Sequence, residues 1–336
     1  MPWWRRDPPK PDEPDALSRR DFFRRFGGGA VDIIRPAEEP PTRRPPASPM
    51  LPQRPLGRTG LMVPILGFGT ARLGRTRDPE SAAALLHEAI ELGVTFIDTG
   101  SEEGGYGAAQ RIVGEVMRQR RSQVFLSTKI FEPDGSAGRR MLERALQELQ
   151  TDRVELLHAH SLGHAHMDPQ VVFGPNGVFR MLLQARAEGL CRFVGATCHN
   201  RSARVLSALA EYDLDAVMVP ANFVDAHTYG FEARVWPVAR QKGCGLIAMK
   251  VFAGPAEGVD TPATMPRQFQ DLAFRYALSL DGCASAVVGM LDRRELHENV
   301  QRARTYQPLA GHERARVDEV GPGLAAKWGR HLGDEE

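Results

Sequence analysis

Short apolar runs alternate with longer amphipathic segments along most of this chain. Eight apolar runs read as buried β-strands, because each has the length of a strand and is bounded by polar or turn-forming residues. Between them, apolar residues recur at the spacing of a helix that packs on one face, as in Leu85, Leu86, Ala89 and Ile90. The expected strands are residues 63–68, 95–98, 124–129, 154–160, 193–197, 216–220, 245–250 and 286–288.

This alternation predicts an α/β fold of parallel strands, specifically a (β/α)8 TIM barrel. The expected helices are residues 78–93, 108–117, 138–149, 177–188, 201–211, 231–241, 267–278 and 293–302. Eight strand–helix units over about 250 residues have the size of such a barrel. An open doubly wound sheet is the alternative, and the lack of a G-x-G-x-x-G motif after the first strand argues against it.

The segments that flank the barrel differ in composition. Residues 56–63 have apolar ends around a glycine-flanked polar turn, which predicts an N-terminal β-hairpin. Residues 1–50 hold eleven of the 25 prolines and little apolar periodicity, so they predict a disordered Pro/Arg-rich arm. We therefore expect three parts: the arm at 1–50, the barrel at 51–310, and a short C-terminal helix with a polar tail at 311–336.

The arm contains a motif that resembles the twin-arginine export signal of bacteria, with Arg19 and Arg20 at its centre. An export signal continues into an apolar stretch of about 7–15 residues. Here residues 27–34 are short and carry Asp32, which favours a cytoplasmic location. Export to the periplasm by the twin-arginine route is the alternative.

Composition narrows the classes of partner. The formal net charge of +1 indicates no general attraction to nucleic acid or to an anionic membrane. The four cysteines, Cys191, Cys198, Cys244 and Cys283, form no C-x-x-C pair, so we expect buried thiols in a reducing compartment and no metal framework. The chain is expected to be a monomer or a small homo-oligomer.

Titratable side chains stand at or just after the ends of three successive expected strands. Asp98, Lys129 and His160 end these strands, and Tyr106 lies in the loop after the first. Polar groups at the carboxyl ends of parallel strands form the active site of a TIM barrel. An acid, a phenol, an amine and an imidazole gathered there are suited to proton transfer at a carbonyl group.

Each of these four side chains has a predicted role in reducing a carbonyl group. Tyr106 is the expected general acid, although a free tyrosine has a pKa near 10. We expect Lys129 to lower that pKa, since an ammonium group favours the phenolate, and Asp98 to keep Lys129 charged. His160 is expected to donate a hydrogen bond that orients the carbonyl oxygen.

The order of these residues resembles the aldo-keto reductases, as does the hairpin before the first strand. The resemblance spans about residues 56–304, and it selects His160 rather than His158 as the catalytic histidine. The matching segments are Phe96-Ile97-Asp98-Thr99, Tyr106-Gly107, Ser127-Thr128-Lys129, the Leu-x-x-Leu-x-Thr-Asp ending at 146–152, Gly195-Ala196-Thr197 and Glu298-Asn299.

The resemblance implies an NAD(P)H-dependent oxidoreductase that reduces an aldehyde or ketone, with NADPH or NADH as cofactor and a small carbonyl compound as substrate. The cofactor-binding residues that it implies are Thr70, Asp98, Thr197, Met249, Lys250, Gly289, Glu298 and Asn299, with no metal.

Several positions depart from the family pattern. Residues 102–105 look like an insertion between Asp98 and Tyr106. Met218 replaces a glutamine near the nicotinamide, and Met249 replaces the aromatic ring that stacks on it. The residues that usually hold the 2′-phosphate of NADP fall on Met290, Leu291, Asp292 and Glu295, which predicts a weaker preference for NADP. Lys250, Arg293 and Arg294 are the cations that could hold this phosphate instead.

Two other classes of function fit parts of the sequence. A barrel that binds the cofactor and a partner protein without much turnover would explain both the altered cofactor positions and the insertion at residues 102–105. A metal-dependent hydrolase would use the His158-Ala159-His160 pair, because alternate strand residues face the same side. No carboxylate or further histidine on the first strand completes such a metal site, which favours the reductase.

Overall fold

The computed structural model describes residues 50–76, 78–254 and 263–335. The predicted N-terminal arm, with Arg19 and Arg20, lies outside these residues except for Met50. The account below therefore concerns the barrel and the C-terminal segment.

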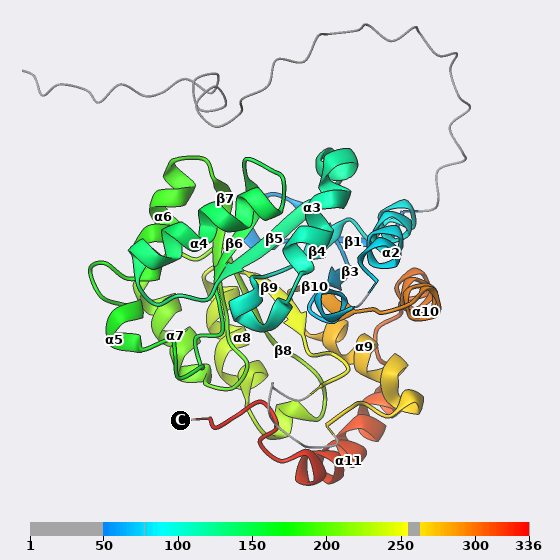
Figure 1. Cartoon of the computed structure of the whole chain (residues 1–336). Helices are drawn as coiled ribbons and strands as arrows, with labels where there is room; N and C mark the ends of the chain where they lie inside the picture. Colours follow the sequence, from blue (N-terminus) through cyan, green and yellow to red (C-terminus); the bar gives the residue numbers. More distant parts are fainter. Residues whose placement is uncertain (1–49, 77, 255–262, 336) are drawn as a thin grey trace, which may run out of the picture. The chain divides into compact units, whose positions relative to one another are not determined.

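Eight parallel strands form a closed barrel in which each strand pairs with the next along the chain and the last pairs with the first. This confirms the predicted (β/α)8 TIM barrel, and Figure 1 shows the helices arranged around the strands. The strands are β3 (Leu66–Gly69), β4 (Phe96–Asp98), β5 (Phe125–Ile130), β6 (Val154–Ala159), β7 (Cys191–Thr197), β8 (Ala216–Pro220), β9 (Gly245–Met249) and β10 (Cys283–Gly289).

A predicted helix follows each barrel strand. At the start of the first, Asp78 Oδ1 accepts a hydrogen bond from Ser81 N at 3.1 Å, and Pro79 occupies the first turn. The sequence analysis did not predict the single turn α5 (Pro169–Val172) in the loop after β6. The predicted helices are α2 (Pro79–Glu91), α3 (Ala109–Arg120), α4 (Gly135–Glu148), α6 (Val178–Ala187), α7 (Ser202–Glu211), α8 (Phe231–Gln241), α9 (Gln270–Ser279) and α10 (Arg293–Arg304).

The first predicted strand is in fact two strands in two sheets. Residues 63 and 64 belong to β2 (Met62–Pro64), which pairs antiparallel with β1 (Gln53–Pro55) and forms the predicted hairpin. The barrel strand β3 begins only at Leu66. Pro64 has no N–H group to donate to a continuing strand ladder, which explains why the chain changes sheets there.

The hairpin fills the amino-terminal end of the barrel. Leu56 and Val63 are fully buried and pack in one cluster with Phe96, Met218 and Ile247 from the barrel interior. Apolar side chains therefore close this end, and polar groups are left to the opposite end, where the strands finish.

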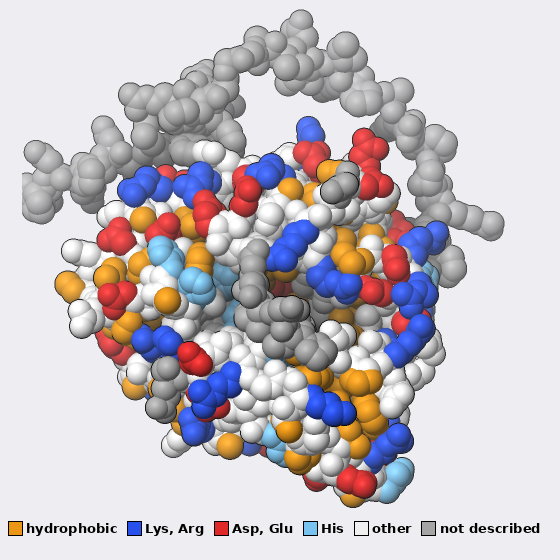
Figure 2. Space-filling model, turned by 60° about the horizontal axis from the view of Figure 1, so that its bottom comes forward, with side chains coloured by type: hydrophobic (Ala, Val, Ile, Leu, Met, Phe, Trp, Pro, Cys, Tyr) orange, Lys and Arg blue, Asp and Glu red, His pale blue; other side chains and the backbone are white. Residues whose placement is uncertain are grey.

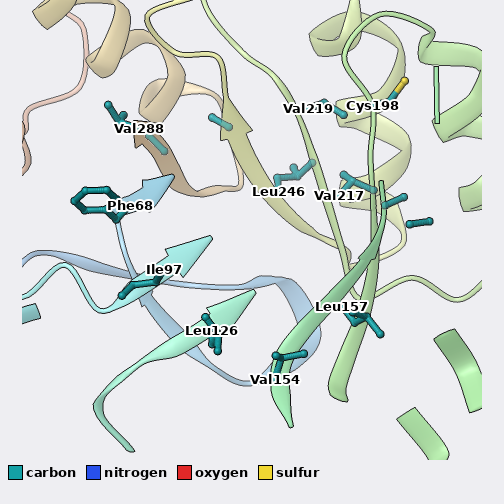
Figure 3. Packing of buried hydrophobic residues seen from close by; sticks show 14 of the residues in the cluster. Phe68, Ile97, Leu126, Val154, Leu157, Cys198, Val217, Val219, Leu246 and Val288 are labelled. Carbon is teal, nitrogen blue, oxygen red and sulfur yellow. The ribbon is translucent and has the colours of Figure 1, made fainter. Parts of the chain in front are cut away.

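Alternation along the strands decides which residues reach the interior. Phe96 lies in the interior cluster, whereas Ile97 lies in the larger cluster between strands and helices. Figure 3 shows part of the larger cluster, with Ile97, Leu126 and Leu157 on neighbouring strands. With a period of two, Asp98 returns to the interior at the carboxyl end of β4.

The C-terminal segment begins with the predicted helix, α11 (Gly311–Trp328), which has 18 residues. The expected polar tail differs from the structure, because His331 is fully buried and Leu332 is nearly so. Within the described part of the chain, no helix is long and apolar enough to span a membrane.

The hairpin turn provides a test of this packing. In Gly57→Ala the new Cβ would lie 2.4 Å from Gly245 N, and the residue has a φ of +50°. We expect a loss of about 2–3 kcal/mol in the free energy of unfolding, measured by urea denaturation.

Gly60→Ala is the matched control, because Gly60 also has a positive φ of +72° but no atom lies within 4 Å of the added Cβ. It should cost only the conformational penalty of about 1 kcal/mol. Equal losses in the two variants would show that the hairpin does not press against the barrel as described.

Candidate active site

A buried ion pair lies at the carboxyl ends of β4 and β5. Lys129 Nζ is 2.6 Å from Asp98 Oδ2 and donates a second hydrogen bond to Thr99 O at 2.7 Å. The side chains of Lys129 and Asp98 are 1% and 3% exposed, so each charge depends on the other. The structure therefore joins two of the residues that the sequence predicted to act together.

Ser127 holds the carboxylate from the other side. Its Oγ donates to Asp98 Oδ1 at 2.7 Å, and the two residues are paired in the register of β4 and β5. The sequence analysis missed Ser127, although it precedes Lys129 by two residues and therefore faces the same side of the strand. Asp98 thus has both oxygens engaged and a defined orientation.

The suspected insertion forms a compact turn that brings Tyr106 to this pair. Residues Glu102–Tyr106 make one π-helical turn, η3, and Ser101 caps it by accepting a hydrogen bond from Gly104 N. The Tyr106 hydroxyl lies 3.5 Å from Asp98 Oδ2, and Lys129 Nζ lies 4.4 Å from the centre of the Tyr106 ring. The extra residues therefore leave the phenol beside the ion pair.

The expected lowering of the Tyr106 pKa is wrong for this structure. Burial and the nearby Asp98 carboxylate raise the pKa of Tyr106 well above its ordinary value. Lys129 does not reverse this because its ammonium group points to Asp98 and Thr99 O and meets the face of the ring. Burial lowers the pKa of Lys129 while Asp98 opposes that change. Tyr106 is therefore a neutral phenol that retains its proton.

His160 stands beside Tyr106, with 5.8 Å between the two ring centres. Burial, followed by the positive charge of Lys129, lowers the pKa of His160 well below its ordinary value. The η3 turn packs closely against this ring: a Cβ on Gly104 would lie 2.7 Å from His160 Nδ1, so only glycine fits there. The structure thus places a neutral imidazole next to the phenol.

His158, which the resemblance did not select as the catalytic histidine, is paired with Lys129 in the register of β5 and β6. It is fully buried in the barrel interior, and neither ring nitrogen has a hydrogen-bond partner among the described residues. Burial lowers the pKa of His158 well below its ordinary value. Of the two histidines, only His160 contacts the ring of Tyr106.

Further histidines line the same side of the barrel mouth, and Figure 2 shows histidine side chains grouped on one face. The ring of Phe131 lies between 5.0 and 5.5 Å from the rings of His160, His164 and His166. The ring centre of His199 is 6.3 Å from that of His160, and burial lowers the His199 pKa to about 3. The sequence analysis did not anticipate Phe131 or His199 at this position.

Three predicted cofactor residues stand at or just after the carboxyl ends of barrel strands, and Thr70 adjoins the ion pair. Thr70 Oγ1 donates to Asp98 O at 3.1 Å, and Gly289 is paired with Gly69 just before Thr70. Thr197 is buried at the end of β7, where its Oγ1 accepts a hydrogen bond from Ser161 N at 2.8 Å. These residues thus belong to the rim of the barrel at the ends of its strands.

Two further predicted cofactor residues follow at the end of β9. Met249 lies with Met218 in the interior cluster, and both are buried. Lys250 has a left-handed backbone with a φ of 54°, and its Nζ donates to Gly254 O at 3.0 Å. Burial lowers the pKa of Lys250. Met218 and Met249 therefore supply thioethers where the family that the sequence resembles has an amide and an aromatic ring.

The remaining cofactor candidates, Glu298 and Asn299, lie on α10. Glu298 pairs with Arg267 at 2.6 Å, and Asn299 Oδ1 accepts a hydrogen bond from Arg302 at 2.8 Å. Both residues are thus surrounded by arginines. They do not touch the Asp98–Lys129 pair, as expected for residues that would contact the far end of a long cofactor.

Acidic side chains occupy the start of α10. Asp292 caps the helix by accepting a hydrogen bond from Glu295 N at 2.7 Å. Glu295 pairs with Arg72 at 3.1 Å, and Arg293 is engaged by Glu88 at 2.8 Å. Arg293 is therefore a weaker candidate for holding a phosphate than the sequence suggested. Arg294 is also engaged by acids, because it lies 3.8 Å from Asp292 and 3.4 Å from Glu298.

Two buried polar atoms near this site have no partner among the described residues: Thr99 Oγ1 and His160 Nδ1. Unpaired polar atoms are costly in a protein interior. Together with the polar rim of threonines and Lys250, they fit a site that receives a polar ligand.

Comparison with known proteins identifies the chain. A family model described as the aldo/keto reductase family matches residues 65–258, which is more than half of the sequence. The chain belongs to the aldo/keto reductase family. Membership confirms the resemblance and the predicted enzyme class, an NAD(P)H-dependent oxidoreductase.

The similarity to individual relatives extends over nearly the full length of each relative. L-galactose dehydrogenase from Arabidopsis thaliana is 27% identical over 308 residues, which cover 80% of this chain and 92% of that protein. Pyridoxal 4-dehydrogenase from Microbacterium luteolum is 25% identical and covers 74% of this chain and 92% of its own length. An aldo-keto reductase structure from Klebsiella pneumoniae in complex with NADPH has a TM-score of 0.62 at 21% identity, over 79% of this chain and 94% of that chain, which shows a shared fold.

The buried histidines make stability depend on pH. Unfolded histidine takes up a proton as the pH falls below about 6.5, whereas folded His158, His160 and His199 stay neutral because their pKa values are lowered. Stability should therefore be lost as the pH falls below 6.5, by about 1.4 kcal/mol per pH unit for each histidine until its folded pKa is reached.

The variant His158→Met tests this contribution, because it removes one buried imidazole that has no hydrogen-bond partner among the described residues. Urea denaturation between about pH 7.5 and pH 5 should show a shallower loss of stability than in the unsubstituted protein. His312→Gln, on the exposed surface of α11, is the control and should keep the original pH dependence. An unchanged slope in His158→Met would contradict a neutral buried imidazole.

Proposed function

We propose that this aldo/keto reductase reduces the carbonyl group of a small aldehyde or ketone to an alcohol, with Tyr106 as the general acid. The observation that carries the proposal is the Tyr106 hydroxyl 3.5 Å from Asp98 Oδ2, above the buried pair that Asp98 forms with Lys129. His160 stands beside the phenol and can direct a carbonyl oxygen toward it.

A nicotinamide cofactor would supply the hydride for this reaction. The Klebsiella pneumoniae structure is named as a complex with NADPH, which supports the same kind of cofactor here. Thr70, Thr197 and Met249 would surround its nicotinamide end, and Lys250 and Gly289 would follow along the rim. Glu298 and Asn299 on α10 would contact its adenine end.

The neutral state of Tyr106 suits a proton donor. Hydride addition turns the carbonyl oxygen into an alkoxide, which is a much stronger base than a phenolate. Tyr106 can therefore give up its proton despite a pKa that burial and Asp98 raise well above the ordinary value. His160 is held neutral, so it can donate or accept a hydrogen bond at the oxygen without a competing charge.

Lys129 has a different role from the one predicted from sequence. After Tyr106 loses its proton, a phenolate faces an ammonium group that lies 4.4 Å from the ring centre. That positive charge stabilises the anion at the moment when it forms. Asp98 fixes the position of Lys129, and Ser127 in turn fixes Asp98.

The polar mouth favours hydroxylated carbonyl compounds as substrates. His164, His166 and His199 surround the approach to His160 and offer several hydrogen-bonding nitrogens. One similar protein is named L-galactose dehydrogenase, after a sugar rich in hydroxyl groups. We further propose that the protein acts in the cytoplasm as a monomer or a small homo-oligomer.

The two other classes of function receive less support. The non-catalytic reading was motivated by residues 102–105, yet the η3 turn brings Tyr106 to Asp98. The metal-dependent hydrolase needs several ligands, and no group of three or more His, Cys, Asp or Glu side chains in the described ranges is arranged to hold a metal ion.

Tyr106→Phe tests the assigned general acid. With NADPH or NADH and a panel of alkyl and hydroxylated aldehydes, kcat/KM should fall by about two to four orders of magnitude, because the proton donor is lost. Cofactor affinity, measured by fluorescence quenching, should change little.

Tyr212→Phe is the control, since this tyrosine packs against Phe179 away from the ion pair. Equal turnover in Tyr106→Phe and the unsubstituted protein would refute the proposed role. Cofactor binding without turnover by any carbonyl compound would favour the non-catalytic barrel, and stoichiometric zinc without cofactor binding would favour the hydrolase.

Glu295→Gln tests the predicted weak preference for NADP. An acid at the phosphate position repels the 2′-phosphate of NADPH. Here Glu295 also forms a salt bridge with Arg72, which keeps that cation from a phosphate. Removing the charge should raise kcat/KM for NADPH roughly tenfold relative to NADH. Glu91→Gln is the control, because Glu91 pairs with Arg120 rather than with Arg72. An unchanged ratio would show that Glu295 does not face the phosphate.

A further inference from the structure

The backbone of Lys250 is held in an unusual conformation at the cofactor rim. Its φ of 54° lies in the left-handed region, which residues other than glycine seldom adopt. Its carbonyl oxygen accepts a hydrogen bond from Asn222 Nδ2 at 2.9 Å. A conformation of this kind persists when the surrounding structure enforces it. The Lys250 carbonyl group is held by two hydrogen bonds, one from Ala253 N at 2.7 Å within its own turn and one from Asn222 in a neighbouring loop.

Asn222 is fully buried in the loop after β8, and its amide group is fully used. Its Oδ1 accepts hydrogen bonds from Val224 N at 3.0 Å and Asp225 N at 2.9 Å. Its Nδ2 donates to Asp225 Oδ2 at 2.7 Å as well as to Lys250 O. The orientation of Asn222 therefore depends on Asp225.

Asp225 depends in turn on the C-terminal tail. Its Oδ1 is 2.7 Å from His331 Nε2, and the side chains of Asp225 and His331 are 3% and 0% exposed. The next residue, Leu332, donates its N–H to the Tyr229 hydroxyl at 2.7 Å. The ring of His331 packs edge-on against Trp328, with 5.4 Å between the ring centres.

We propose that His331 is a positioning residue for the nicotinamide cofactor. It acts through Asp225 and Asn222 on the backbone of Lys250; we refer to His331, Asp225 and Asn222 as the tail relay. The proposal rests on the function proposed above, because it takes Lys250 as part of the cofactor rim. Nothing in the relay touches the Tyr106 hydroxyl or the Asp98–Lys129 pair in the described residues.

Loss of His331 would leave the Asp225 carboxylate buried without a donor at Oδ1. A buried, unpaired acceptor is costly, so the loop would rearrange to reach water and would release Asn222. Lys250 would then lose one of the two hydrogen bonds to its carbonyl oxygen, the one that comes from outside its own turn. Cofactor binding should weaken, whereas the chemical step at Tyr106 should be retained once cofactor is bound.

The main test is His331→Phe, which keeps an aromatic ring against Trp328 but has no donor for Asp225. The Kd of NADPH and of NADH, by fluorescence quenching, and the KM for the cofactor should rise on the order of tenfold. At saturating cofactor, kcat and the KM for the carbonyl compound should stay within about twofold. This split between cofactor KM and kcat separates positioning from general loss of structure.

Two further variants keep the proposal testable if His331→Phe does not fold. Tyr229→Phe removes the hydroxyl that anchors Leu332 N, and it should raise the cofactor Kd by about threefold. His331→Gln retains a side-chain N–H that can reach Asp225, so its Kd should lie close to that of the unsubstituted protein. Tyr306→Phe loses a 3.0 Å hydrogen bond to Leu278 O outside the relay and is the matched control.

The results distinguish this proposal from the proposed function. Binding of NADPH or NADH by the unsubstituted protein, with equal affinity in His331→Phe, Tyr229→Phe and Tyr306→Phe, overturns the tail relay alone. A drop in kcat with unchanged cofactor Kd also overturns it. An unsubstituted protein that binds neither cofactor overturns the proposed function and the relay together.

Discussion

The ion pair between Lys129 and Asp98 is the interaction on which the rest of the site depends. Both charges are removed from water, and each is tolerated because the other lies 2.6 Å away and further hydrogen bonds come from Ser127 and to Thr99. The barrel makes this possible by placing the ends of β4 and β5 side by side. Tyr106 then rests on a centre whose charge and position are defined.

Much of this architecture could be predicted from the sequence because it depends on the local spacing of apolar residues. The short apolar runs placed Asp98 and Lys129 at the ends of neighbouring strands, and helical spacing located the helix after each barrel strand, though not α5. The strand prediction was wrong where a single residue makes the chain pass from one sheet to another. Pro64 ends the hairpin strand, and no apolar pattern distinguishes that break from a continuous strand.

The chemistry of the site was less predictable because it depends on distances in space. The sequence shows that a lysine and a tyrosine belong together, but not that the ammonium group meets the face of the ring while the carboxylate lies nearest the hydroxyl. That arrangement reverses the direction of the Tyr106 pKa. Likewise, His331 and Asp225 are 106 positions apart, and no spacing rule connects them.

The hairpin that closes one end of the barrel also limits how small compounds can reach the site. With Leu56 and Val63 sealing one end, any compound that reaches Lys129 must enter and leave through the opposite opening. If cofactor and carbonyl compound meet at Tyr106 as proposed, both would use this opening, and the one bound deeper would bind first and leave last. Closure of one end of the barrel would thus set the order of the binding and release steps.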